Sequence, residues 1–230
     1  MSSEEKRYIG ILLGLGSLLF LGNLLWIIRD KTPLFYDSYW NFLLSMKLFQ
    51  GVKGGDFPAI YRIAYECRLP FLIPLITVPF YFISGISQDI AVMVNSTFTL
   101  GILLFSLFQL GKEISDYRAG FWSAFIFLMY PLVFTQQKTF MMDLPLTAFV
   151  CLAIYLLIKS EYFRRFLPSL LFAGIFLLGL LIKINFLLFV SPPLLWIGIK
   201  RWKAWRIKNK LILLILIFIG VFFFLYFFIS

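Results

Sequence analysis

Long apolar runs recur along this chain, and they set the first limit on how it folds. Eight segments are made largely of apolar side chains: 8–28, 69–86, 90–111, 119–136, 143–158, 166–182, 184–199 and 211–229. Several approach the length of about 20 residues that an α-helix needs to cross a hydrocarbon core of about 30 Å. Because 61% of the residues are hydrophobic and only 14% are charged, the composition also belongs to the membrane class. The sequence therefore predicts an all-α fold, a polytopic bundle of transmembrane helices.

Charge and composition exclude several functional classes. The net charge of +10 comes from basic residues that cluster in short loops between apolar runs, where they act as topology signals and as contacts for anionic membrane lipids. This distribution excludes nucleic-acid binding. Cys67 and Cys151 have no metal-ligand spacing, so neither a disulfide framework nor a Cys-rich site is supported. The chain has no histidine, which leaves carboxylates for any acid–base chemistry.

Three short connections hold most of the basic residues: 112–118, 159–165 and 200–210. The positive-inside rule assigns them to the cytoplasmic side, together with Lys6 and Arg7 at the start of the chain. All three connections face that side only if one early apolar segment does not cross. Segment 69–86 is the candidate because its three prolines, Pro70, Pro74 and Pro79, interrupt helical hydrogen bonding.

The sequence therefore predicts a single transmembrane domain over residues 1–230 with about seven spans. The first span is 8–28, and six further spans lie within 90–230. Residues 29–89 form a long extracytoplasmic loop with interfacial helices, one of which is the kinked segment 69–86. Because the last apolar run ends the sequence without a polar tail, we expect the chain to be the N-terminal part of a longer protein.

The first loop contains a narrow polar stripe. After Thr32-Pro33, a suitable helix start, the stretch "LFYDSYWNFLLSMKLFQG" has Asp37, Asn41 and Ser45 at positions i, i+4 and i+8. A stripe of this kind on an apolar helix suits an element in the membrane interface whose polar side faces a wet cavity, so Asn41 is a candidate substrate-binding residue. The alternative is an interfacial helix that only exposes Asp37 to water.

Further charges lie between apolar runs on the predicted outer face. In "KTFMMDLPL", Asp143 precedes a proline in a first helical turn, which suits a helix N-cap and is also compatible with a functional role. Lys183 lies between the closely spaced runs 166–182 and 184–199, where it either snorkels from a helix end or serves a site. Lys138 fits an interface residue. Asn95-Ser96-Thr97 reads as a glycosylation sequon, but it lies in an apolar run and is discounted.

Taken in order, these features form a recognisable pattern. One span is followed by a long outer loop that opens on "YDSYWN" and by a proline-containing apolar piece. Then come "YRAGFWSAFIFLMYPLVFTQQKTFMMDLPLTAFVCLAIYLL" and "GIFLLGLLIKINFLLFVSPPLLW". This order resembles the GT-C glycosyltransferases, especially the branch of protein O-mannosyltransferases and lipid A aminoarabinose transferases. A small-Ala-apolar-Pro phrase, a D-x-P-L tail and a GL-x-x-K turn carry the similarity over most of residues 30–200.

The resemblance implies an inverting transfer of a sugar from a polyprenyl-phosphate donor to a hydroxyl of a protein, lipid or glycan acceptor. The site would lie on the extracytoplasmic face of a prokaryotic cell membrane. By position, Asp37 matches the acidic residue that acts as, or orients, the catalytic base, Asp143 matches an aspartate near the active site, and Lys183 matches a lysine that faces the donor phosphate.

Two further ligand expectations accompany the resemblance. Related chains often carry an arginine where this one has Met93, so Arg68 or Lys138 is the candidate to replace that phosphate-binding cation. The sequence leaves open whether Asp37 and Asp143 hold a divalent cation; with only oxygen ligands, such a site favours Mg or Mn over zinc.

Two other functions stay open. Charged residues in apolar sequence also mark substrate paths, so a multi-pass transporter or a lipid-handling permease is the main alternative. Such folds usually contain internal repeats with paired interrupted segments, and no such repeat is visible here. A non-catalytic, truncated relative is the second alternative, because Ser38 and Met93 depart from the family pattern and the sequence stops within an apolar run.

Overall fold

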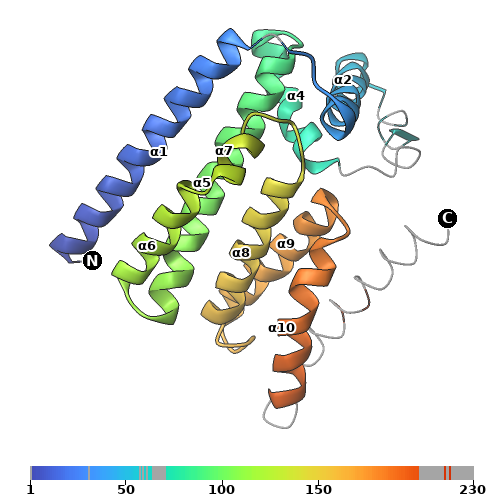
Figure 1. Cartoon of the computed structure of the whole chain (residues 1–230). Helices are drawn as coiled ribbons and strands as arrows, with labels where there is room; N and C mark the ends of the chain where they lie inside the picture. The colour runs from blue at the N-terminus through green and yellow to red at the C-terminus, as the bar shows by residue number, and fades with distance from the viewer. Residues whose placement is uncertain are drawn as a thin grey trace.

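The computed structural model describes residues 2–30, 32–56, 58, 60, 62–63, 71–201, 215 and 218. No strand occurs in these ranges, which confirms the predicted all-α fold for them. The helices are α1 (Ser3–Arg29), α2 (Tyr36–Gly54), α4 (Leu72–Ser84), α5 (Gln88–Ile114), α6 (Tyr117–Leu128), α7 (Pro131–Gln136), α8 (Asp143–Lys159), α9 (Phe166–Ile182) and α10 (Phe186–Arg201). In Figure 1 the long helices run side by side as a bundle. The connection 202–210 and most of the predicted last span, 211–229, lie outside the described residues.

Two of the described helices are long and apolar enough to cross a membrane, α1 and α5, with 27 residues each. A helix of this length rises about 40 Å, which exceeds the hydrocarbon core. Only 17% of the apolar window of α1 is buried in the protein, against 50% for α5. The difference arises because α1 packs on the outside of α5 and α6, whereas α5 also contacts α4 and α8. Helices α4, α9 and α10 are apolar but shorter, and the count of seven spans stays a prediction.

One predicted apolar segment, 119–136, is not a single helix. Helix α6 ends at Leu128 and α7 begins at Pro131, with Tyr130 in an extended conformation between them. Proline has no backbone N–H to donate and disfavours helical geometry in the residue before it, so the helix breaks here. The short α7 then leads into residues 137–142, which we call the α7–α8 connection.

Different helices and turns lie at the two ends of the bundle (Figure 1). One end, called the α2 end, holds the C-terminus of α1, helices α2 and α4, the α7–α8 connection and the turn between α9 and α10. The opposite end holds the N-terminus of α1, the α5–α6 turn and the α8–α9 turn. The basic connections 112–118 and 159–165 therefore share one end with Lys6 and Arg7, as the charge pattern predicts. Asp37, Lys138 and Lys183 belong to the α2 end.

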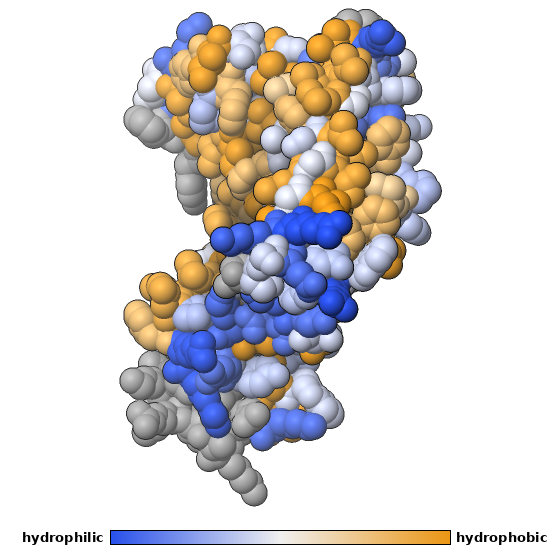
Figure 2. Space-filling model, turned by 90° about the vertical axis from the view of Figure 1, so that its left-hand side faces the viewer, coloured by the Kyte–Doolittle hydropathy of each residue, from blue (hydrophilic) through white to orange (hydrophobic). Residues whose placement is uncertain are grey.

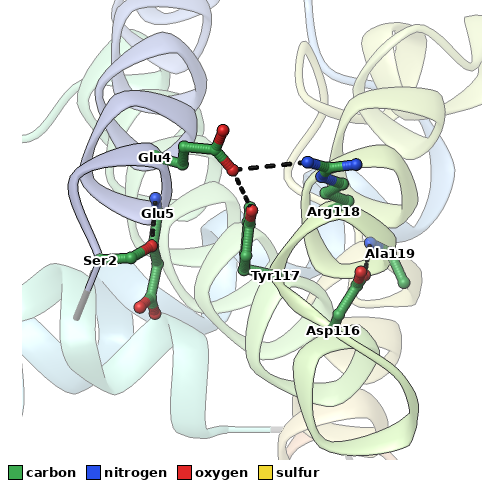
Figure 3. A network of polar contacts seen from close by, with 7 residues as sticks. All are labelled: Ser2, Glu4, Glu5, Asp116, Tyr117, Arg118 and Ala119. Atoms are coloured by element: carbon green, nitrogen blue, oxygen red, sulfur yellow. Dashed lines mark hydrogen bonds and ion pairs between the residues drawn. The ribbon is translucent and has the colours of Figure 1, made fainter.

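Carboxylates in the first turn of α1 tie it to its neighbours at the opposite end (Figure 3). Glu5 forms an ion pair with Lys112 of α5. Glu4 accepts a hydrogen bond from the Tyr117 hydroxyl and pairs with Arg118 across 3.4 Å. Acidic residues also complement the positive end of the helix dipole, so the start of α1 is fixed in two ways.

Helices α5 and α6 touch through two glycines. A Cβ on Gly111 would lie 2.6 Å from the Cα of Gly120, and a Cβ on Gly120 would lie 2.3 Å from the carbonyl oxygen of Phe108. The turn just before this contact is tight because Asp116 caps α6, its Oδ1 accepting the N–H of Ala119 at 2.8 Å. Small residues at a crossing allow two membrane helices to approach at backbone distance.

Aromatic side chains lie at the centre of the largest buried cluster. The largest fully buried ones are Tyr81, Phe140, Phe172, Phe176 and Phe186. The Phe176 and Phe186 rings meet edge to face at 5.8 Å between centroids, which joins α9 to α10. This packing holds together α4, α9, α10 and the α7–α8 connection, the elements that carry or border the candidate site.

The exterior is apolar over much of one face. Figure 2 shows apolar residues across the upper part of that face and hydrophilic residues gathered at mid-height and below. Large apolar side chains of α1 contribute, with Leu13, Leu18 and Leu25 each more than half exposed. An exterior of this kind suits contact with lipid.

Candidate functional site

Asp143 and Lys183 meet at the α2 end. Lys183 Nζ donates to Asp143 Oδ1 at 2.7 Å, and both side chains stay partly exposed. The predicted N-cap role of Asp143 is off by one position, because Met142 is the N-cap of α8 and Asp143 is the first residue of the helix. Its carboxylate is therefore available to Lys183 and also lies at the favourable positive end of the helix dipole. The structure thus brings together two candidates that are 40 residues apart.

A close helix contact positions Lys183. Lys183 is the C-cap of α9, and its backbone N–H donates to the carbonyl of Gly179 at 3.2 Å. A Cβ on Gly179 would lie 2.5 Å from the buried ring of Phe186, so a larger residue there would have to displace this ring, which packs where α10 folds back on α9. The glycine and the lysine of the GL-x-x-K phrase therefore serve one turn, the first by making it and the second by projecting from it.

Asp37 lies in the first turn of α2 and is exposed. It forms no ion pair with any residue that the structure describes, in contrast to Asp143. The residue before it, Tyr36, has a φ of 47°, a left-handed conformation that is unfavourable for a bulky side chain. Residues 33–35 are outside any helix, Phe35 is extended, and the Gln88 side-chain oxygen accepts the Leu34 N–H at 3.0 Å. Helix α2 thus begins at Tyr36, later than Thr32-Pro33 suggested.

A pocket of about 370 Å³ opens beside the start of α2. Its wall comes from the end of α1, residues 32–36, Ser38, the start of α5 and the α7–α8 connection. Asp37 does not line it, although both of its neighbours, Tyr36 and Ser38, do. The pocket combines aromatic surface with carboxylate, hydroxyl, amide and ammonium groups, which is typical of a site for a small polar ligand.

Lys138 is the cation of this pocket among the described lining residues. Its Nζ lies 3.6 Å from the centre of the Trp26 ring and 3.8 Å from that of Phe134, so the ammonium is held between two aromatic faces. Burial lowers the pKa of Lys138, and the neighbouring Asp30 carboxylate opposes part of that shift. Lys138 is therefore a fixed element of the pocket wall. From the sequence it was both an interface residue and a candidate phosphate-binding cation, and the second role stays a prediction.

Asp30 borders the same pocket at the C-cap of α1. Its Oδ1 accepts hydrogen bonds from the Thr32 hydroxyl at 2.7 Å and the Thr32 N–H at 3.0 Å, and its Oδ2 accepts the Trp26 indole N–H at 3.0 Å. The Thr32 hydroxyl bond is the main cause that lowers the pKa of Asp30. Sequence reasoning missed this residue, whose signal is the Asp-x-Thr spacing directly after an apolar run.

The polar stripe of α2 does not face water along its length, contrary to the prediction. Asn41 and Ser45 are 4% and 0% exposed. Asn41 Nδ2 donates to the carbonyl of Phe140 at 2.9 Å, and Ser45 Oγ lies 2.8 Å from the Tyr81 hydroxyl. The stripe is buried because α2 packs against α4 and the α7–α8 connection, which supply polar partners in place of solvent. Asp37, at the helix end, is the exposed member.

Two further expectations from the sequence concern Arg68 and a divalent cation. Arg68 and Cys67 lie outside the described residues. No group of three or more His, Cys, Asp or Glu that could hold a metal occurs in the described part of the chain, and the Asp143 carboxylate is engaged by Lys183. Whether Asp37 and Asp143 share a divalent cation stays open.

Comparison with known proteins identifies a family. A family model described as dolichyl-phosphate-mannose-protein mannosyltransferase matches residues 69–228, well over half of the chain. The match includes Asp143, Lys183 and Lys138 and begins after α2, so Asp37 lies outside it. No curated protein and no solved structure matches the chain.

Proposed function

Because the chain belongs to the dolichyl-phosphate-mannose-protein mannosyltransferase family, whose members are membrane glycosyltransferases of the GT-C type, we propose that it transfers a sugar from a polyprenyl-phosphate-linked donor to an acceptor hydroxyl. The family match is the observation that carries this proposal. It favours a transferase over a permease. The acceptor is a protein, lipid or glycan hydroxyl that reaches the α2 end.

In the proposed reaction, Asp37 is the general base. Its exposed carboxylate accepts the proton of the acceptor hydroxyl while the hydroxyl oxygen attacks the anomeric carbon of the donor sugar. The bond from that carbon to the phosphate oxygen breaks, and the lipid phosphate leaves with the electron pair. Attack opposite to the leaving group inverts the configuration. A carboxylate without an ion pair to a described residue suits this role, because no cation within the described part of the chain competes for its lone pairs.

Lys183 is proposed to stabilise the charge that develops on the departing phosphate. Asp143 holds the lysine through the 2.7 Å hydrogen bond, so the ammonium is oriented before the donor arrives. Charge stabilisation is stronger in a partly dehydrated site than in water. We propose that the α2 end faces the extracytoplasmic side, since the basic connections 112–118 and 159–165 lie at the opposite end.

The test is the Asp37→Asn variant. The chain is reconstituted in lipid nanodiscs with a set of polyprenyl-phosphate sugars, and transfer to acceptor is measured with labelled sugar. Loss of a general base lowers a reaction rate by about 100-fold or more. We therefore expect the sugar-transfer rate of Asp37→Asn to fall by at least this factor while its thermal unfolding is unchanged. Glu113→Gln, an exposed carboxylate at the opposite end, is the matched control and keeps wild-type activity. Full transfer by Asp37→Asn would overturn the base assignment, and a wild type inactive with every donor would overturn the function.

A further inference from the structure

The α7–α8 connection is an irregular segment that is buried. Gln137, Phe140 and Met142 are 1%, 0% and 4% exposed. A buried segment without helix or strand has backbone carbonyls that need donors from elsewhere, because an unpaired carbonyl away from water is costly.

Side-chain amides of two helices supply them. Asn95 of α5 donates from Nδ2 to the carbonyls of Thr139 at 3.1 Å and Met141 at 3.2 Å. Asn41 of α2 donates from Nδ2 to the carbonyl between them, that of Phe140, at 2.9 Å. Three consecutive carbonyls are thus each paired with an asparagine N–H. An asparagine amide has two N–H groups, which is how Asn95 serves two of them.

A third asparagine fixes the beginning of the same segment. Asn23 of α1 is 2% exposed, and its Nδ2 donates to the Gln137 side-chain oxygen and to the Ser96 hydroxyl at 3.3 Å. Helices α1, α2 and α5 therefore each contribute one buried asparagine to the connection. Polar side chains buried between membrane helices commonly serve as interhelical hydrogen-bonding groups.

The held segment forms part of the pocket. Lys138, Thr139 and Met141 all line it, and Asp143 follows directly at the start of α8. The carbonyls of Thr139 and Met141, bonded by Asn95, thus belong to residues of the pocket wall. A shift of this backbone would move Lys138 away from the Trp26 and Phe134 rings and change the space offered to a ligand.

We propose that Asn95 and Asn41 are positioning residues, whose amide N–H groups hold the α7–α8 connection so that the pocket wall and Lys138 keep the geometry required to bind the lipid-linked donor. The proposal rests on the proposed function for the identity of the ligand. It reassigns Asn41, a candidate substrate-binding residue from sequence, to a role exerted through the backbone of Phe140. It also assigns a role to Asn95, which the sequence analysis considered only as part of a glycosylation sequon.

The experiment compares Asn95→Leu and Asn41→Leu with Ser106→Ala in nanodiscs. Leucine has the same branched skeleton of heavy atoms as asparagine but no N–H donor, so each change removes the bonds without opening a cavity. Ser106 is a fully buried polar residue of α5 whose hydroxyl donates to the Ile102 carbonyl of its own helix, which makes it the matched control. Hydrogen–deuterium exchange of peptides covering 137–142 and steady-state donor kinetics are measured for each.

Loss of one hydrogen bond is expected to speed exchange in 137–142 by about fivefold or more. Misplacement of the pocket wall is expected to lower kcat/KM on the order of ten- to hundredfold, carried mainly by a higher KM for the donor. Ser106→Ala changes neither. Unchanged exchange in both asparagine variants would overturn the inference, as would faster exchange with wild-type KM. Two variants on different helices keep the test decisive if one fails to insert, and the exchange result stands whether or not the wild type transfers sugar.

Discussion

At the residue scale, charge at the α2 end divides into paired and unpaired groups. Lys183 is bonded to Asp143, and Lys138 lies beside Asp30 and between two aromatic rings. Asp37 makes no ion pair with a described residue. The proposed base, Asp37, therefore differs from Asp143 and Asp30 in having no cationic partner among the described residues. The two lysines are already oriented by their neighbours before a ligand binds.

Asp30 makes a pH-dependent contribution to stability. Its folded pKa is lowered, chiefly by the Thr32 hydroxyl bond, from an ordinary value of 3.8. A carboxyl with a lowered folded pKa stabilises the native state above its unfolded pKa and loses that contribution as the pH falls through its folded pKa. We expect the difference in unfolding free energy between wild type and Asp30→Asn to be constant near neutral pH and to shrink below about pH 4.

Thermal unfolding in detergent between pH 3 and pH 7 measures this difference. Thr32→Val removes the hydroxyl donor but keeps the backbone N–H, so it should give a smaller change with the same pH dependence. A difference that does not vary with pH would show that Asp30 contributes by packing and not by its charge.

At the element scale, the sequence predicted the long helices well and their interruptions less well. Helices α1, α5, α8, α9 and α10 follow the apolar runs within a few residues, because apolar length is what an uninterrupted membrane helix requires. Pro131 is a helix-breaking residue, but because the residues around it are apolar, segment 119–136 was predicted as one run and the end of α6 was missed. The burial of the α2 stripe was not predictable, since the partners of Asn41 and Ser45 lie 99 and 36 residues away.

The glycine contact between α5 and α6 predicts a position-specific effect on stability. Gly→Ala within an exposed helix normally favours the helix by about 1 kcal/mol. At Gly120 the new methyl would overlap the Phe108 carbonyl oxygen, so we expect Gly120→Ala to destabilise the protein by about 1–3 kcal/mol.

Chemical unfolding followed by circular dichroism tests the sign of this change in the free energy of unfolding. Gly101 of α5 is the control, because a Cβ there meets no atom within 4 Å and Gly101→Ala should be neutral or stabilising. Equal effects at the two glycines would mean that the α5–α6 contact is looser than the backbone distances indicate.

At the scale of the whole molecule, sequence and structure agree on how charge is distributed along the bundle. The N-terminus and the connections 112–118 and 159–165 lie at one end. The elements that carry Asp37, Lys138, Asp143 and Lys183 lie at the other: the start of α2, the α7–α8 connection, the start of α8 and the end of α9. The charges of the loops could predict this arrangement, because the side on which each loop lies depends only on whether an even or an odd number of spans separates it from the others. The pairing of Asp143 with Lys183, the Lys138 pocket and the asparagine contacts required tertiary structure, since their members are far apart in sequence.

The arrangement predicts that the two ends label from opposite sides of a membrane. In a background with Cys67 and Cys151 replaced by alanine, Lys138→Cys should react with an impermeant maleimide from the extracytoplasmic side, and Glu161→Cys only after permeabilisation. Glu161 is exposed in the α8–α9 turn, so it is open to the reagent. Reaction of both cysteines from the same side would contradict the proposed orientation.

The three asparagine-bonded carbonyls of residues 139–141 also limit how this protein can be altered. Surface loops usually accept added residues, since their backbone bonds to water. A single residue inserted between Gln137 and Asp143 would instead shift each carbonyl past its amide partner and move Phe140 out of its buried site. Epitope tags and fluorescent fusions should therefore be inserted at other turns. We also expect related proteins with the same asparagine contacts to vary in length at other turns and to keep the length of the α7–α8 connection constant.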